Sequence, residues 1–194
     1  MKIRMQLMSD VVFGNGESIP GGEDISVLSD GNGFPYYKGG TFKGIFREEM
    51  ENYLMWTLQG EDQVKAEMIR LLGTGGDDSV LNLDKLVFSD FTLSDYVRQQ
   101  ILSEIGAGQK YTVLDALSHI RTFTAISSDG IVKDGSLRQC RCINKGLNLY
   151  SEIKCSPKDE QLVEEILSMI KWVGTMRSRG FGKVKLTVVR AGNR

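Results

Sequence analysis

Alternating hydrophobic and polar positions predict strands at residues 2–8, 147–155 and 183–190. In the first of these, Ile3, Met5 and Leu7 are separated by charged or polar residues. This period of two is typical of a strand that buries one face. Residues 80–93 have the apolar, β-prone composition of a further strand. The pattern therefore predicts a sheet that uses both ends of the chain.

Helical spacing appears in two other segments. Apolar residues recur every three or four positions over residues 41–58, from Phe42 to Leu54, which predicts an amphipathic helix. A second helix is expected to open at Ser156–Pro157, with Ser as N-cap and Pro in the first turn. Gly174 is a plausible C-cap of this helix.

Three segments interrupt these elements. Residues 14–33 form a long Gly- and Asp-rich loop, and the charged, glycine-containing residues 60–79 predict a mobile loop. Residues 119–143 contain the turn signals Asp129-Gly130 and Asp134-Gly135, which favour a hairpin or protruding β-arm. The order is that of a split βαβ unit, so we expect one α+β domain over residues 1–194, with a ferredoxin-like core and a β-rich insertion. This fold hosts many functions.

Composition excludes several classes of protein. The 194 residues are 41% hydrophobic, yet no apolar run approaches the eighteen residues of a membrane span. The N-terminus lacks the apolar block of a signal peptide, so a cytoplasmic location is expected. Three cysteines without a CxxC pair argue against a disulfide framework or structural zinc site, and a single histidine, His119, excludes zinc sites built on several histidines. We expect a structural or surface role for His119.

Charge is unevenly distributed although the net charge is only −1. A near-neutral chain is unlike a free-standing, non-specific nucleic-acid binder. However, residues 1–100 carry nine Lys and Arg against sixteen Asp and Glu, whereas residues 101–194 carry fifteen against nine. One pole of the protein is therefore suited to face phosphates.

The segment 174–186, GTMRSRGFGKVKL, combines glycines and cations without an acid. It is not a nucleotide P-loop, because a helix precedes it, a strand follows, and Val184 stands where Ser or Thr is required. Its backbone N–H groups, with Arg177, Arg179 and Lys183, are suited to clamp a sugar–phosphate backbone. A turn with solvated cations is the alternative.

A second anion site is suggested by residues 35–48, where glycines precede the first predicted helix. The first turn of a helix offers unpaired N–H groups and the positive end of a dipole. Tyr36 and Tyr37 could stack on bases. An ordinary helix start with core aromatics explains the segment equally well. The candidate contacts are Lys38, Gly39, Gly40, Lys43 and Arg47.

Carboxylates gather on the early loop, at Glu23, Asp24 and Asp30. Facing a basic surface, such groups can bind a divalent metal or accept a proton. Simple solvation is the alternative for each of them.

Three motifs, in order, resemble the RAMP superfamily of CRISPR–Cas proteins, specifically the backbone subunit of type III RNA-targeting complexes. GGEDISVLSDGNGFPYYKGGTFKGIFRE resembles the family's Gly-Gly-x-Asp segment and the helix after it. RTFTAISSDGIVKDGSLRQCRCINKGLNLYSEI resembles its β-arm, or thumb, and RSRGFGKV resembles its glycine-rich signature loop. The resemblance implies a modified RNA-recognition fold in which residues 119–143 form the thumb.

The resemblance also assigns roles. Asp24 matches the catalytic aspartate, either as ligand of a divalent cation, Mg²⁺ being the expected one, or as a base. The residues that fall on guide-RNA-binding segments are Lys38, Gly39, Gly40, Thr41, Lys43, Arg47, Arg121, Arg177, Ser178, Arg179, Gly180, Gly182 and Lys183. The implied activity is cleavage of complementary target RNA by attack of its own 2′-OH.

Partners follow from the same resemblance. They are guide RNA, target RNA, further copies of the chain arranged head to tail, a large polymerase/cyclase-like subunit, small helical subunits and end-capping RAMP subunits, with no membrane. Two alternatives stay open. A catalytically inactive guide-binding scaffold is one, since Val12 and Phe13 stand where many active relatives have a histidine. A guide-processing ribonuclease is the other.

Overall fold

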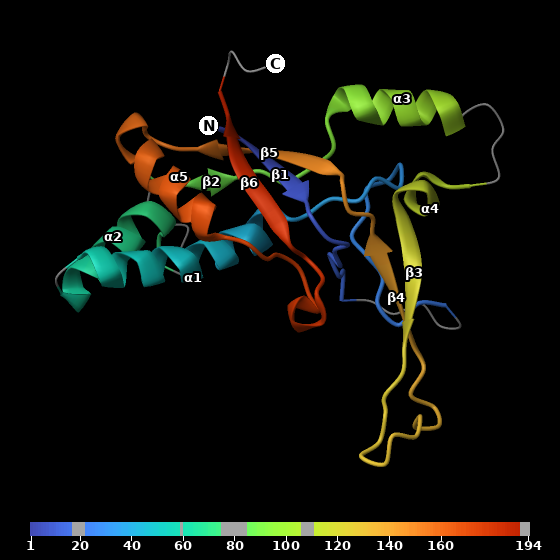
Figure 1. Cartoon of the computed structure of the whole chain (residues 1–194). Helices are drawn as coiled ribbons and strands as arrows, with labels where there is room; N and C mark the ends of the chain where they lie inside the picture. Colours follow the sequence, from blue (N-terminus) through green and yellow to red (C-terminus); the bar gives the residue numbers. More distant parts are fainter. Residues whose placement is uncertain (17–21, 59, 75–84, 106–110, 191–194) are drawn as a thin grey trace.

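A four-stranded antiparallel sheet forms the centre of the protein. The computed structural model describes residues 1–16, 22–58, 60–74, 85–105 and 111–190. The strands β1 (Lys2–Leu7), β2 (Val87–Phe88), β5 (Asn148–Lys154) and β6 (Val184–Val189) are ordered β2-β5-β1-β6 (Figure 1). With one helix after β1 and another after β5, this is the βαββαβ arrangement of a ferredoxin-like fold, which confirms the predicted α+β class.

Alternation along β1 sets the register of the sheet. Ile3, Met5 and Leu7 are buried, and β1 pairs with β5 on one side and β6 on the other. Helices α1 (Gly39–Thr57) and α5 (Glu160–Met169) pack against each other and cover the sheet. Their buried side chains are Phe42, Phe46, Met50 and Leu54 from α1, and Val163, Ile166 and Leu167 from α5.

The predicted loop over residues 60–79 is wrong in its first part. Residues Glu61–Leu72 form helix α2, which packs against α1 through a stripe that includes Val64, Met68 and Leu71. Gly73 ends this helix with a positive φ of 74°. Residues 75–79 of the predicted loop lie outside the described part of the chain.

The strand predicted over residues 80–93 is much shorter in the structure. Residues 80–84 lie outside the described ranges, and β2 comprises only Val87–Phe88. Beyond it, Phe91 and Thr92 make single bridges to Tyr37 and Tyr150. The chain nevertheless stays beside β5, because Thr92 and Tyr150 exchange N–H···O hydrogen bonds of 2.9 and 2.7 Å.

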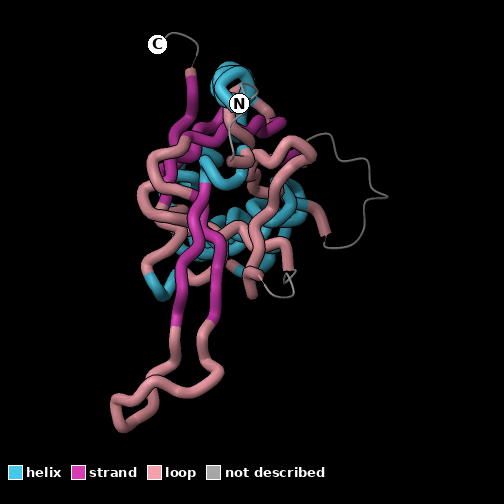
Figure 2. Tube along the Cα trace, turned by 90° about the vertical axis from the view of Figure 1, so that its right-hand side faces the viewer, coloured by secondary structure: helices cyan, strands magenta, loops and turns pink. Residues whose placement is uncertain are grey.

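The insertion between β2 and β5 contains two helices that the sequence interpretation missed, α3 (Asp95–Ile105) and α4 (Val113–Leu117). They precede the antiparallel hairpin of β3 (Ser118–Phe123) and β4 (Arg138–Ile143). This hairpin and its connecting loop project from the body as a thumb (Figure 2). In the described residues, no helix combines the length and apolar character needed to cross a bilayer.

The second predicted helix ends earlier than expected. A short 3₁₀ turn (η1, Pro157–Asp159) precedes α5, and α5 ends at Met169, with Ile170 as its C-cap. Gly174 therefore lies in the loop after the helix and is not its cap. That loop contains a second 3₁₀ turn (η2, Arg177–Arg179) before β6.

Candidate nucleic-acid interface

Glycines at both ends of the 174–183 loop allow close backbone contacts. A Cβ atom on Gly182 would lie 2.0 Å from the Val173 carbonyl oxygen, and one on Gly174 would lie 2.6 Å from the Val12 carbonyl oxygen. The Val173 N–H donates to the Gly182 carbonyl (2.9 Å), and the Gly182 N–H donates to the Asp10 carbonyl (2.8 Å). These contacts join the two stems of the loop to the end of β1.

The tip of this loop has the geometry of an anion-binding nest. Met176 is the one non-glycine residue with positive φ (58°) in the described ranges, and it is followed directly by η2. Gly180 then returns to positive φ. Successive N–H groups in such an alternation point into one concavity. Four N–H groups have no partner among the described residues, those of Met176, Arg177, Ser178 and Phe181.

The base of the thumb packs against this loop through an arginine–phenylalanine stack formed by Arg121, Phe123, Arg179 and Phe181. The Arg121 guanidinium lies 5.3 Å from the Phe181 ring centroid, and the Arg179 guanidinium lies 5.5 Å from that of Phe123. The two rings meet edge to face at 5.9 Å. Sequence reasoning missed the phenylalanines, although the repeated Arg-x-Phe spacing at 121–123 and 179–181 is a signal that links them.

Asp10, just after β1, joins the same elements. Its Oδ2 lies 3.9 Å from Arg121 Nη1 and 3.6 Å from His119 Nε2, and its Oδ1 accepts the Lys145 N–H at 3.1 Å. The other ring nitrogen of His119 lies 2.7 Å from the Asn144 side-chain oxygen. The histidine is thus held at the thumb base in structural contacts.

The start of α1 is organised differently from a simple anion site. The Gly39 N–H donates to Asp90 Oδ1 (2.8 Å), so a carboxylate already occupies this helix end. Gly39 is buried, and a Cβ there would lie 2.4 Å from the Phe88 carbonyl oxygen, so no larger residue fits. By contrast, Lys38, Gly40 and Thr41 are exposed.

Two further residues of this segment, Arg47 and Tyr37, make contacts within the protein. The Arg47 guanidinium donates to the carbonyls of Leu72 (3.3 Å) and Gly73 (3.2 Å), at the end of α2. Tyr37 is 3% exposed and stacks on Phe13 at 4.4 Å between ring centroids. Burial raises the pKa of Tyr37. The hypothesis that Tyr37 stacks on bases is therefore wrong, because its ring belongs to the core.

Asp24 lies on the opposite edge of β4 from β3. Its N–H donates to the Gln139 carbonyl (2.9 Å), and its Oδ2 accepts the Gln139 N–H (2.7 Å). Ile25 then pairs in parallel with Cys140. The carboxylate is exposed, and its Oδ1 has no partner in the described residues. The thumb strand thus fixes the position of Asp24 and leaves one oxygen for a ligand or a proton.

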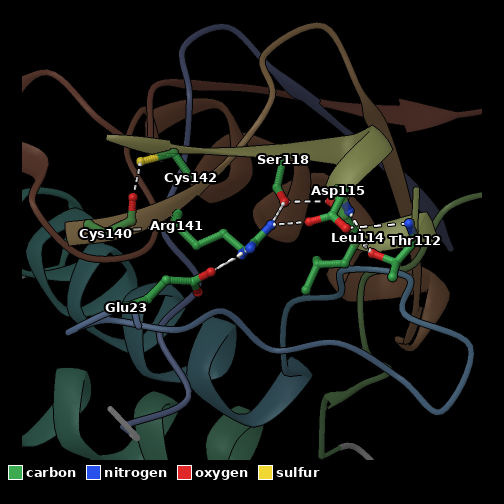
Figure 3. A network of polar contacts seen from close by, with 8 residues as sticks. All are labelled: Glu23, Thr112, Leu114, Asp115, Ser118, Cys140, Arg141 and Cys142. Atoms are coloured by element: carbon green, nitrogen blue, oxygen red, sulfur yellow. Dashed lines mark hydrogen bonds and ion pairs between the residues drawn. The ribbon is translucent and has the colours of Figure 1, made fainter. Parts of the chain in front are cut away.

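The other two loop carboxylates are engaged within the protein. Glu23 is 6% exposed and accepts a hydrogen bond from Arg141 Nε at 2.6 Å (Figure 3). Asp30 accepts the N–H groups of Asn32 and Phe34 and pairs with Arg98. Partial burial raises the pKa of Asp30, but the hydrogen bonds outweigh it and the net pKa is lowered. Of the three candidates, only Asp24 presents a carboxylate outward.

These residues do not assemble a protein site for Mg²⁺. Across the described ranges, no three His, Cys, Asp or Glu side chains are placed so that they could hold a metal ion. Asp24 offers a single carboxylate oxygen, and Glu23 is bound to Arg141. The predicted cation finds no preassembled ligand set among these residues.

Comparison with known proteins decides the family. A sequence model of the RAMP superfamily matches residues 4–185. This chain belongs to the RAMP superfamily. No curated protein matches it significantly. This RAMP protein resembles one chain in each of two solved structures. They are the type III-B Cmr-beta complex bound to cognate target RNA and the same complex in its apo state. The first aligns with a TM-score of 0.64 at 12% identity over 95% of both chains, and the second with 0.66 at 12% over 96% of this chain and 95% of that one.

Proposed function

We propose that this RAMP protein is the guide-RNA-binding backbone subunit of a type III CRISPR complex and that it cleaves the paired target RNA. The observation that carries the proposal is the placement of two different groups on the two edges of the thumb. The arginine-rich nest lies beside β3, and the outward carboxylate of Asp24 lies beside β4. One hairpin can thereby separate an RNA-holding surface from a cutting group.

Guide binding is assigned to the 174–183 loop and the thumb base. Unpaired backbone N–H groups at the loop tip donate hydrogen bonds to phosphate oxygens, and the exposed side chains of Arg177, Arg179 and Lys183 add positive charge. Lys38, Gly40, Thr41 and Lys43 extend the same role to the start of α1. Arg121 is held near the loop by Phe181 and Asp10.

Cleavage is assigned to Asp24. The 2′-oxygen of the target attacks the adjacent phosphorus, a new O2′–P bond forms, and the P–O5′ bond breaks. The leaving 5′-oxygen takes a proton from solvent water, so the products are a 2′,3′-cyclic phosphate and a 5′-hydroxyl. Asp24 Oδ1 accepts the proton of the 2′-OH, while Oδ2 stays bound to Gln139. The protein's main contribution is to hold the nucleotide in line for this attack.

Assembly follows the same proposal. One of the structural neighbours is a complex bound to cognate target RNA. Copies of this chain would line up head to tail on the guide, together with a large polymerase/cyclase-like subunit, small helical subunits and end-capping RAMP subunits. The uneven distribution of charge along the sequence, acidic in its first half and basic in its second, is suited to contacts between oppositely charged surfaces of successive copies.

A catalytically inactive scaffold is the second candidate. It is favoured by the engagement of one Asp24 oxygen with Gln139 and by the lack of a preassembled metal site in the described residues. Guide binding would be the same in this case, and another subunit would cut.

The test uses the guide-loaded complex with end-labelled complementary RNA, in Mg²⁺ or in EDTA. We compare the parent, Asp24→Ala, and Arg177→Ala with Arg179→Ala. We expect regularly spaced cuts in the parent, none with Asp24→Ala despite intact target binding, and weak guide loading in the arginine double variant. The EDTA arm shows whether cleavage depends on a divalent cation. Tight target binding without cuts in the parent would identify the scaffold instead.

A further inference from the structure

Arg141, on β4, connects three separate parts of the protein (Figure 3). Its Nε donates to Glu23 Oε1 (2.6 Å), and Nη2 forms an ion pair with the same oxygen. Its Nη1 donates to Asp115 Oδ1 on α4 and to Ser118 Oγ at the start of β3, both at 3.0 Å. The loop before the Asp24 segment, α4 and the thumb therefore meet at one side chain.

We propose that Arg141 is a positioning residue for Asp24, acting through its ion pair with Glu23. This inference rests on the proposed function of Asp24. It assigns a role to two residues that neither the sequence motifs nor the cleavage chemistry requires.

Glu23 and Asp24 are neighbours that face opposite ways. In extended backbone, successive side chains point to opposite faces. Accordingly, Glu23 is buried and Asp24 is exposed. From Asp24 onward the segment is paired to β4, since Asp24 bonds to Gln139 and the Arg141 N–H donates to the Ile25 carbonyl (3.1 Å). Glu23 is the anchor at the N-terminal end of this pairing, so its displacement moves Asp24.

Loss of Arg141 would release that anchor. A buried carboxylate is tolerated only when it is paired, and removing the partner leaves an uncompensated charge. Glu23 Oε2 already lacks a hydrogen-bond partner in the described residues, so little else holds the group. Glu23 regains water when the segment moves away from β4, and this movement breaks the Asp24–Gln139 bonds.

The Asp115 end of Arg141 responds differently. Asp115 is exposed and accepts hydrogen bonds from Thr112 at the start of α4. These bonds and the Arg141 contact lower the pKa of Asp115. Without Arg141, water and Thr112 would still satisfy this carboxylate. The consequence of losing the arginine is therefore concentrated on Glu23 and on the segment that carries Asp24.

The experiment measures single-turnover cleavage by the guide-loaded complex at saturating labelled target. Arg141→Met should slow cleavage by about 100-fold, the usual cost of misplacing a reacting group by about 1 Å, with guide loading and target affinity unchanged. Adding Glu23→Gln to Arg141→Met removes the buried charge and should restore about tenfold of the lost rate. Arg190→Met, which breaks an exposed pair with Glu164, is the matched control and should cleave like the parent.

A parental cleavage rate in Arg141→Met would overturn the inference and leave the function of Asp24 standing. Should that variant fail to assemble, Arg141→Lys and Glu23→Gln decide instead. Each should assemble and cleave about tenfold more slowly, and parental rates in both would overturn the inference.

A parent that does not cleave would contradict the proposed function, and hydrogen exchange then decides the inference separately. The Asp24 amide, which donates to Gln139, should exchange at least about tenfold faster in Arg141→Met than in the parent, because local opening becomes easier. It should return toward the parental rate in the double variant. Equal exchange in all of these proteins would show that Arg141 does not hold the segment.

Discussion

A Cβ atom on Gly182 would overlap the Val173 carbonyl oxygen, whereas one on Gly180 would meet no atom within 4 Å. Both residues have positive φ, at 81° and 86°. The two positions therefore require glycine for different reasons within one motif. Gly180 is needed for its backbone conformation alone, and Gly182 is needed also because two chain segments touch there.

We predict that Gly182→Ala costs about 3 kcal/mol of unfolding free energy, the sum of backbone strain and steric overlap. Gly180→Ala should cost only about 1–2 kcal/mol, since it adds strain without overlap. Urea unfolding of the two variants and the parent measures this difference. Equal midpoints for the two variants would mean that the Val173 contact imposes no constraint on residue 182.

At the scale of elements, the regular pattern was enough to predict α1 and three of the four strands of the central sheet, β1, β5 and β6. Strands β1 and β5 alternate clearly because each buries one face, and α1 has a long apolar stripe. In β6 only Val184 is buried, although its sequence alternates from Lys185 to Thr187. Helix α2 was missed because its charged residues and flanking glycines suggested a loop, although Val64, Met68 and Leu71 have helical spacing. Helix α3 has no fully buried side chain, so it leaves little trace in the hydrophobic pattern.

The candidate site, too, could be predicted from the sequence only in part. The glycine-rich loop and Asp24 stand in recognisable motifs, and the structure places them on the two edges of the thumb. The contacts of Glu23 with Arg141 and of Gly39 with Asp90 join residues 118 and 51 positions apart. No local pattern encodes such pairs. They depend on the register of the thumb and on the path of the chain after β2.

Arg47 joins two helices and allows a prediction at this scale. Its two hydrogen bonds to the last carbonyls of α2 should make Arg47→Ala less stable by about 1–2 kcal/mol. In folded protein, guide affinity should be unchanged, because the guanidinium is already bound. Arg177→Ala is the control and should show the reverse, with parental stability and weaker guide binding. Thermal unfolding and RNA titration measure both properties. An Arg47→Ala protein with parental stability and weak guide binding would show instead that Arg47 contacts the guide RNA.

At the scale of the whole molecule, the candidate RNA surface lies at one end of β6. The 174–183 loop and thumb base adjoin that end, while the described chain leaves β6 at the other end, near Arg190 (Figure 1). Arg190 is exposed and paired with Glu164 on α5. From Arg177 to Arg190 the sequence contains basic residues and no acid. The length of β6 divides this stretch, and only its first part faces the thumb.

This separation predicts how salt acts on RNA binding. Each phosphate neutralised on a single strand contributes about −0.7 to the slope of log K against log salt concentration, through release of counterions. Replacing Arg177 and Arg179 by Ala should therefore reduce the magnitude of the slope by about 1.4. Arg190→Ala removes one positive charge from the far end of β6 and should leave the slope at its parental value. Fluorescence anisotropy of a labelled single-stranded RNA, titrated at several salt concentrations, measures the slope for the parent and for both variants.

If Arg190→Ala lowered the slope as much per charge as the loop variant, RNA would be held by diffuse attraction to the basic half of the chain. A loss confined to the loop variant would mean that the phosphates are bound where the backbone forms its nest.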